Sequence, residues 1–134
     1  MTASWGGFAW LWNKPVAIIF VRPERYTHCF IEKNEHVTLS FYEKEYRKAL
    51  QICGTRSGRE IDKAKETGLT PIATEKGNVT FAEARLTVEC RKMFKTEMKK
   101  SNFLDLEAHD AHYNEIHGGY HTIYICEIEE ILTK

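Results

Sequence analysis

The sequence has neither an excess of one charge nor a long apolar run. Its 134 residues include 19 lysines and arginines and 19 aspartates and glutamates, so the formal net charge is zero. That balance argues against a nucleic-acid-binding protein that works by bulk positive charge. The longest apolar run, residues 16–21, is far too short to span a bilayer, and no signal peptide is evident. We therefore expect a cytoplasmic protein that has neither a membrane nor a nucleic acid as a partner.

Several chemical motifs are also missing. The four cysteines form no Cys-x-x-Cys pair, so we expect reduced thiols rather than a zinc ribbon. No Gly-x-Gly-x-x-Gly fingerprint and no P-loop occur, which argues against the usual dinucleotide and triphosphate sites. Four histidines lie between residues 109 and 121, but they lack the spacing of a His-Glu-x-x-His site. We therefore predict no bound metal, and we expect His109 and His112 to be solvated.

Hydrophobic periodicity predicts a mainly β protein with short helices. Strands are expected at residues 16–21, 37–41, 84–90 (extended from 79 to 94) and 120–132, and helices at residues 26–33, 43–53, 57–67 and 103–112. Gly54 and Gly68 are the expected helix stops, and Ser57 and Ser101 are the expected caps. Because helices and strands do not alternate regularly, the pattern favours an antiparallel α+β barrel over a doubly wound sheet. Residues 1–134 are expected to form a single domain.

The end of the first predicted strand could hold a phosphate group. Arg22 and Arg25 follow that strand, and Thr27 lies in the first turn of the next helix. Helix amides, a hydroxyl and planar guanidinium groups together favour an anion. An ordinary strand-to-helix turn with exposed arginines explains the same residues, and spacing alone leaves both interpretations open.

A second candidate for phosphate binding follows the helix expected at residues 43–53. Gly54 and Gly58 would let the backbone approach a ligand closely, and Ser57 offers a hydroxyl at a helix start. Lys63 lies about one and a half turns further on. The alternative, which is favoured when this segment is taken alone, is a plain capped helix with a solvated lysine.

Aromatic residues crowd the beginning of the chain. Trp5, Phe8, Trp10 and Trp12 lie beside Gly6 and Gly7. An aromatic wall next to flexible backbone suits a flat heteroaromatic ligand, and it equally suits a subunit interface. Near the other end, His121 opens the last predicted strand and could point into a pocket. No nucleophile with an identifiable base is found, so we assign no catalytic residue from the pattern.

Five segments of the chain occur in an order that resembles a known family. They are Met1-Thr2-Ala3-Ser4-Trp5-Gly6-Gly7, Arg22-Pro23-x-Arg25-Tyr26-Thr27, Cys53-Gly54-x-x-Ser57-Gly58-x-x-x-Asp62-Lys63, Glu89-Cys90-Arg91-Lys92 and Tyr120-His121-x-x-Tyr124-x-x-Glu127-Ile128. Over essentially the whole chain they resemble the flavin reductase-like FMN-binding split β-barrels, which include flavoredoxin-type proteins. The resemblance implies a homodimer with FMN near the subunit interface.

The resemblance also assigns roles to residues. Thr2, Ala3, Ser4 and Trp5 would border the isoalloxazine ring, Arg22, Arg25, Thr27, Ser57, Gly58 and Lys63 would hold the phosphate end, and His121 would lie close to the flavin. The implied activity is oxidation of NADH or NADPH by FMN. Two alternatives remain: an FMN-binding electron carrier that takes electrons from a protein partner, and a barrel that no longer binds flavin.

Two departures from the family pattern bear on the ring end of this site. Relatives usually begin earlier, with a strand, a loop and commonly an Asn before the Met-Thr-Ala-Ser-Trp segment. The barrel here is therefore expected to lack its first strand, with Thr2 and Ser4 poorly ordered. Cys126 stands where a glycine is frequent, so its side chain could crowd a neighbouring strand.

Overall fold

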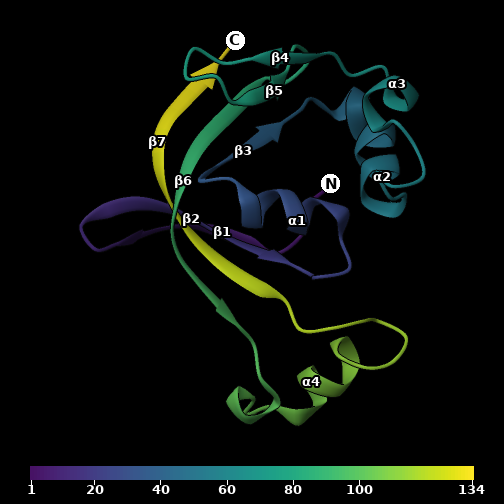
Figure 1. Cartoon of the computed structure of the whole chain (residues 1–134), viewed down its shortest axis with the longest axis vertical. Helices are drawn as coiled ribbons and strands as arrows, with labels where there is room; N and C mark the ends of the chain where they lie inside the picture. Colours follow the sequence, from purple (N-terminus) through teal and green to yellow (C-terminus); the bar gives the residue numbers. More distant parts are fainter.

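The computed structural model describes residues 1–134 and is built on one antiparallel sheet. Its five strands lie in the order β1 (Gly6–Leu11), β2 (Lys14–Val21), β7 (Thr122–Thr133), β6 (Leu86–Glu97) and β3 (His36–Phe41). The sheet does not close, because β1 and β3 are its two edges. In Figure 1 the long β6–β7 pair bends into an arc, and the helices lie on its concave side. The predicted mainly β, α+β barrel-like architecture is confirmed.

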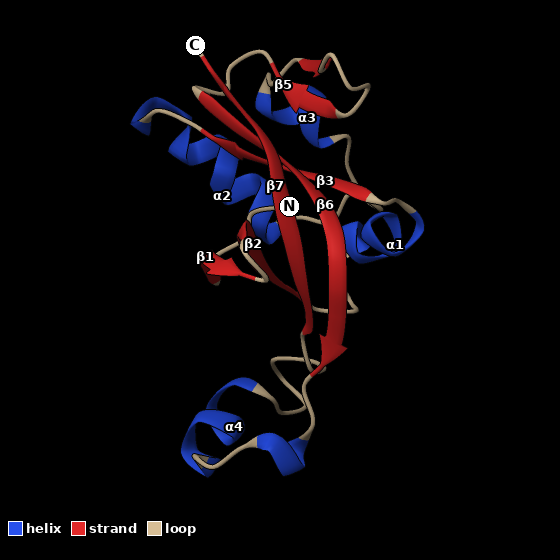
Figure 2. Ribbon diagram, turned by 90° about the vertical axis from the view of Figure 1, so that its left-hand side faces the viewer, coloured by secondary structure: helices blue, strands red, loops and turns tan.

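Short helices and a two-stranded hairpin lie at the two ends of the sheet. They are α1 (Tyr26–Lys33), α2 (Arg47–Thr55) after a 3-10 turn at Lys44–Tyr46, α3 (Lys63–Thr67), the hairpin of β4 (Pro71–Ala73) and β5 (Val79–Phe81), and α4 (Leu106–His112) after a 3-10 turn at Lys100–Asn102. Figures 1 and 2 both show α4 at the end of the β6–β7 pair opposite to α2 and α3. No helix is long and apolar enough to cross a bilayer.

Strand β1 is an element that the sequence pattern did not reveal. The segment shows no alternation of apolar and polar residues, and most of its side chains, including those of Phe8 and Trp10, are exposed. A two-residue turn joins β1 to β2, and both of its residues, Trp12 and Asn13, have positive φ angles of 53° and 57°. That geometry matches the right-handed twist of paired strands. Gly6 is required at the start of β1, since a Cβ there would lie 2.1 Å from the carbonyl oxygen of Ile18.

Several predicted boundaries were wrong because other residues supply the caps. Asp62, rather than Ser57, caps α3 by accepting a hydrogen bond from the Lys65 amide (3.2 Å). Asp105, rather than Ser101, caps α4, where it accepts from two first-turn amides. Gly54 lies inside α2, which continues to Thr55.

Two further elements can be compared directly with the pattern. The segment 79–94 is divided between two strands, because β5 ends at Phe81 and β6 begins at Leu86. Gly68 does end α3, with a φ of 72°. Gly68 ends its helix because it adopts the left-handed conformation, whereas Gly54 stays helical within α2, so a glycine in the sequence does not by itself mark a helix end.

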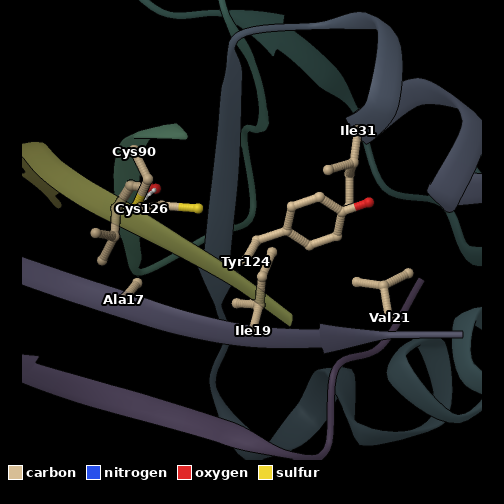
Figure 3. Close-up of a cluster of buried hydrophobic side chains, with 8 residues drawn as sticks. Ala17, Ile19, Val21, Ile31, Cys90, Tyr124 and Cys126 are labelled. Carbon is tan, nitrogen blue, oxygen red and sulfur yellow. Dashed lines mark hydrogen bonds between the residues drawn. The ribbon is translucent and has the colours of Figure 1, made fainter. Parts of the chain in front are cut away.

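The core lies between the sheet and α1. It consists of Ala17, Ile19, Val21, Ile31, Val88, Cys90, Tyr124 and Cys126, most of which appear in Figure 3. Burial of each large apolar side chain stabilises the fold by roughly 1.5–3 kcal/mol. The Tyr124 hydroxyl donates to the Glu32 carboxylate (2.6 Å), which also pairs with Lys95 (2.7 Å). This chain of contacts fixes α1 against β6 and β7.

The cysteines are all free thiols, as expected. Cys90 and Cys126 have no exposed surface, and burial raises the pKa of their thiols to about 12 and about 11. They therefore act as small apolar side chains within the sheet.

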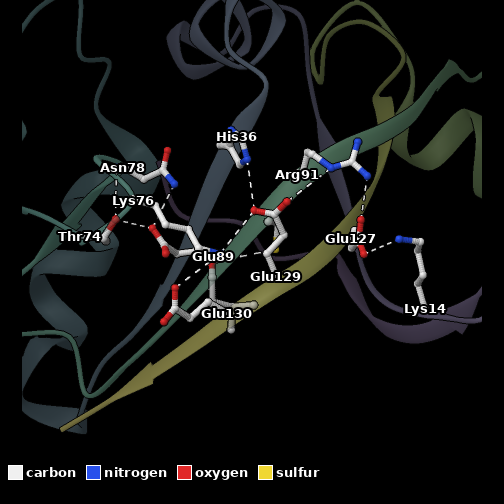
Figure 4. Close-up of polar contacts among 12 residues, drawn as sticks. Lys14, His36, Thr74, Lys76, Asn78, Glu89, Arg91, Glu127, Glu129 and Glu130 are labelled. Atoms are coloured by element: carbon white, nitrogen blue, oxygen red, sulfur yellow. Dashed lines mark hydrogen bonds and ion pairs between the residues drawn. The ribbon is translucent and has the colours of Figure 1, made fainter.

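On the outer surface, an ion-pair network runs across the strands from Lys14 through Glu127 to Arg91 (Figure 4).

Candidate functional site

A single large cavity of about 1670 Å³ lies between the first residues of the chain, α1, β3 and the segment that joins α2 to α3. Four predicted ring-end residues line it, namely Thr2, Ala3, Ser4 and Trp5. Five of the six predicted phosphate-end residues line it as well, namely Arg25, Thr27, Ser57, Gly58 and Lys63. The fold thus brings nine predicted residues from three separate segments to one cavity. Arg22 and His121 lie outside its lining.

Two cationic side chains meet at the end of α2. Arg25 donates to the carbonyl oxygens of Gly54 (2.7 Å) and Cys53 (3.1 Å), and Lys63 donates to the same Cys53 oxygen (2.8 Å). The last carbonyls of a helix lack intrahelical partners and carry partial negative charge, so they attract cations. Burial, and then the neighbouring Arg25 charge, lowers the pKa of Lys63. An anion at this point would relieve the repulsion between the two cations.

The first turn of α1 begins at one of these two cationic residues and also lines the cavity. Arg25 occupies the N-cap position, no side chain caps the helix, and no acidic residue lies in its first turn. Thr27 follows in that turn and lines the cavity. An uncapped helix start with a nearby hydroxyl is a favourable place for a phosphate group.

The loop that contains Ser57 and Gly58 packs directly on α1. The Ser57 hydroxyl accepts a hydrogen bond from the Arg59 amide (3.1 Å). A Cβ at Gly58 would lie 3.1 Å from the ring of Tyr26, so glycine permits this close approach. The Arg59 guanidinium lies over the same ring, 4.6 Å from its centroid. Sequence reasoning did not single out Arg59, although it comes only two residues after Ser57.

Trp5 lines the cavity and packs against two histidines. Its ring centroid lies 5.1 Å from that of His112 and 5.1 Å from that of His121. The segment before it is anchored through the Thr2 hydroxyl, which donates to the carbonyl of Leu50 in α2. Trp5 is therefore held by the region around α4, whereas Thr2 is held by α2.

Arg22 and His121 belong to a second cluster behind Trp5. The Arg22 guanidinium donates to the carbonyls of Gly119 (2.7 Å) and His112 (2.8 Å) and lies 5.0 Å from the centroid of the Tyr113 ring. Nδ1 of His121 and the Tyr113 hydroxyl are 2.6 Å apart. Burial, followed by the Arg22 charge, lowers the pKa of His121 to about 4. His121 is therefore neutral at pH 7.

One of the two histidines of α4 differs from what the pattern suggested. His109 was expected to be solvated, but it is buried, and its Nε2 lies 2.7 Å from the Tyr120 hydroxyl. His112 is exposed, as expected. The error at His109 arose because the helix is short and its inner face packs against Phe103 and Tyr120.

Comparison with known proteins places the fold. The sequence profile of the flavin reductase like domain matches residues 1–134. The chain belongs to this family. Its structure is similar to the flavoredoxins of Desulfovibrio vulgaris (Miyazaki F) (TM-score 0.73, 21% identity) and Methanosarcina acetivorans (0.75, 20%). It is also similar to an FMN-binding protein of Thermus thermophilus crystallised with p-hydroxybenzaldehyde (TM-score 0.71, 17% identity).

These alignments cover 98% of this flavin reductase-like chain and 60%, 59% and 62% of the three structures respectively. The chain thus spans about three fifths of the length of each. Among curated proteins, none matches the sequence significantly. At such low identity the similarity of structure establishes the fold, and the chemistry of the site has to be argued from its own residues.

The residues of the flavin reductase-like cavity fit FMN in kind. A phosphate requires cationic and hydroxyl donors, which Arg25, Lys63 and Thr27 provide at one end. A flat ring requires an aromatic or backbone wall, which Trp5 and the segment before it provide. The two ends belong to the same cavity, and its volume exceeds the few hundred Å³ that a small-molecule site needs.

Proposed function

We propose that the chain binds FMN, with the phosphate at Arg25, Thr27, Ser57 and Lys63 and the ring toward Thr2–Trp5. The observation that carries this proposal is the convergence of Arg25 and Lys63 on one carbonyl beside the uncapped start of α1. Arg25 and Lys63 form no ion pair with a carboxylate. Two partly buried positive charges held together in this way are costly unless an anion binds beside them. Membership of the flavin reductase like domain family supports FMN as that anion.

We further propose that the bound cofactor is reduced by NADH or NADPH. FMN would supply the hydride-accepting chemistry, so the protein need not contain an acid–base pair. Trp5 would pack beside the ring and exclude water from one side. His121 lies behind Trp5 and, being neutral, adds no positive charge there. Arg25 and Lys63 would fix the position of the cofactor through its phosphate.

A homodimer is part of the same proposal. The β1–β2 hairpin leaves Phe8, Trp10 and Trp12 with 56%, 68% and 54% of their surface exposed, and Phe94 lies beside Trp12. Large aromatic side chains are enriched at protein interfaces. A second copy of the chain would bury this edge and complete the wall of the cavity near Trp5. Sedimentation velocity tests it: Trp10→Glu should shift a dimer toward monomer, and a monomeric wild-type protein would contradict it.

The proposed function is tested by the visible spectrum and by anaerobic reduction. The protein mixed with FMN and desalted should show a flavin spectrum, which should bleach on addition of NADH or NADPH. If FMN binds but neither nucleotide reduces it, the electron-carrier alternative takes the place of the reductase. If FMN does not bind, the chain is a barrel of this family without a flavin site.

A further inference from the structure

Two further arginines lie at the phosphate end of the cavity. Arg56 and Arg59 belong to the segment between α2 and α3, and both line the cavity while remaining exposed. The proposed FMN phosphate site does not use either side chain. Arg56 makes a single hydrogen bond, from its amide to the carbonyl of Ile52 (3.0 Å), so its guanidinium has no protein partner.

Arg59 is held in place but is far from satisfied. Its guanidinium stacks on the Tyr26 ring, and one terminal nitrogen donates to the Glu24 carbonyl (3.2 Å). A guanidinium has five N–H donors, so most of those on Arg59 have no protein acceptor. Stacking on an aromatic face leaves the edge of the guanidinium available for bidentate contact with a phosphate.

The position of these arginines relative to the proposed FMN site follows from the contacts of their neighbours. Tyr26, on which Arg59 stacks, directly precedes Thr27 in the first turn of α1. On the other side, Arg25 and Lys63 donate to carbonyls only two and three residues before Arg56. The arginine-bearing segment therefore borders the proposed FMN phosphate site from both α1 and α2.

The cationic side chains that line this end of the cavity, Arg25, Arg56, Arg59 and Lys63, outnumber those that one phosphate requires. Arg25 and Lys63 already match the roughly two negative charges of a phosphate monoester. The acidic residues of the same segment are Glu60 and Asp62, and the Asp62 carboxylate caps the Lys65 amide. Glu60 is exposed and forms no ion pair with either arginine. The cavity, at about 1670 Å³, also exceeds the usual upper range of roughly 1000 Å³ for a ligand pocket.

We propose that Arg56 and Arg59 form a second phosphate subsite, which binds an additional phosphate of a nucleotide larger than FMN. This inference rests on the proposed function, because it places the subsite beside the FMN phosphate. Two nucleotides carry a phosphate of this kind: FAD has a second phosphate in its diphosphate, and NADPH has a 2′-phosphate. The shared chemistry is a phosphate group held by two guanidinium groups.

The test compares ligand pairs that differ by the extra phosphate. Arg56→Gln, Arg59→Gln and the double variant are titrated with FMN and FAD by flavin fluorescence, and with 5′-AMP and 2′,5′-ADP by calorimetry without flavin. Arg85→Gln is the matched control, because Arg85 is an exposed arginine that lines the same cavity but lies beside Glu43. Thermal melting of each variant checks that the fold is retained.

We expect the double variant to bind FAD, 2′,5′-ADP or both at least about 10-fold more weakly, because charged hydrogen bonds to the extra phosphate are lost. The affinities for FMN and 5′-AMP should change little. Arg85→Gln should not alter the ratio of affinities within either ligand pair. Selective loss of FAD identifies the diphosphate as the occupant, and selective loss of 2′,5′-ADP identifies the 2′-phosphate. Equal weakening within both pairs, or no change, overturns the inference.

The outcome also separates this inference from the proposed function. If the wild-type protein binds FMN, and the Arg56 and Arg59 variants weaken both members of each ligand pair equally, the proposed function stands and the second subsite is rejected. Wild-type protein that does not bind FMN removes the proposed function. In that case 2′,5′-ADP binding without flavin still decides whether Arg56 and Arg59 hold a phosphate.

Discussion

The guanidinium of Arg25 and the ammonium of Lys63 donate to the same acceptor, the carbonyl oxygen of Cys53, at 3.1 and 2.8 Å. Like charges this close repel, and the carbonyls at the end of α2 hold them together. The lowered pKa of Lys63, due first to burial and then to Arg25, reflects the cost of this arrangement. A bound phosphate would offset that cost, which is why this pair is central to the proposed site.

Removal of the Lys63 ammonium should weaken FMN much more than riboflavin. Lys63→Ala removes one charged hydrogen bond to the FMN phosphate, which is worth about 1.5–3 kcal/mol. Riboflavin lacks the phosphate, so its binding does not depend on that hydrogen bond. Fluorescence titration with both flavins measures the difference. Lys65→Ala, which removes an exposed lysine from the same helix, serves as the control. Equal loss for both flavins would contradict a phosphate role for Lys63.

Arg22 and Arg25 should behave differently, although the sequence suggested one role for both. Arg22 bridges the carbonyls of Gly119 and His112 outside the cavity, so Arg22→Met should lower stability by ~1–3 kcal/mol and affect FMN and riboflavin alike. Arg25→Met should weaken FMN selectively. Urea unfolding and flavin titration of the two variants provide the comparison. Selective loss of FMN in Arg22→Met would show that Arg22 reaches the phosphate after all.

Gly6 should tolerate no side chain, whereas its neighbour should. Gly6 has a φ of +133°, and a Cβ there would lie 2.1 Å from the Ile18 carbonyl oxygen, so Gly6→Ala should distort the β1–β2 pairing. We expect a loss of at least ~2 kcal/mol in the free energy of unfolding. Nothing lies within 4 Å of a Cβ at Gly7, so Gly7→Ala is the matched control. Similar unfolding curves for the two variants would be inconsistent with this strand geometry.

His121 should make stability depend on pH in a defined window. Its pKa falls from 6.5 to about 4 on folding, chiefly through burial. As the pH drops through this interval, the unfolded chain takes up a proton that the folded chain does not, so the free energy of unfolding decreases. Between the two pKa values the slope approaches ~1.4 kcal/mol per pH unit, whereas above the unfolded-state pKa of 6.5 His121 no longer makes stability depend on pH. Urea unfolding should show a shallower pH dependence for His121→Asn; an unchanged dependence would contradict the assignment.

Apolar patterns predicted the parts of the fold that bury side chains. Residues 16–21 and 26–33 were found as β2 and α1 because each places an apolar face in the core. Strand β1 was missed because its aromatic side chains remain exposed in this chain. Its structure depends on pairing with β2 and on the positive φ angles of Trp12 and Asn13, which side-chain hydrophobicity does not encode.

The candidate site was predictable in composition but not in arrangement. Motif order brought Thr27, Ser57 and Lys63 into one hypothesis, and the fold places them in one cavity. Spacing could not reveal that Arg22 turns away toward the region of α4, since that depends on where residues 112 and 119 lie. It likewise gave no sign that Tyr113 would fix His121, because the two meet only after α4 has folded back.

The most direct test of the account is a titration of the wild-type protein with FMN and with riboflavin under the same conditions. If Arg25, Thr27, Ser57 and Lys63 form a phosphate site, FMN should bind at least about 10-fold more tightly than riboflavin, the difference expected from charged hydrogen bonds to the phosphate. Equal affinities for the two flavins, or no binding of FMN, would contradict the central claim.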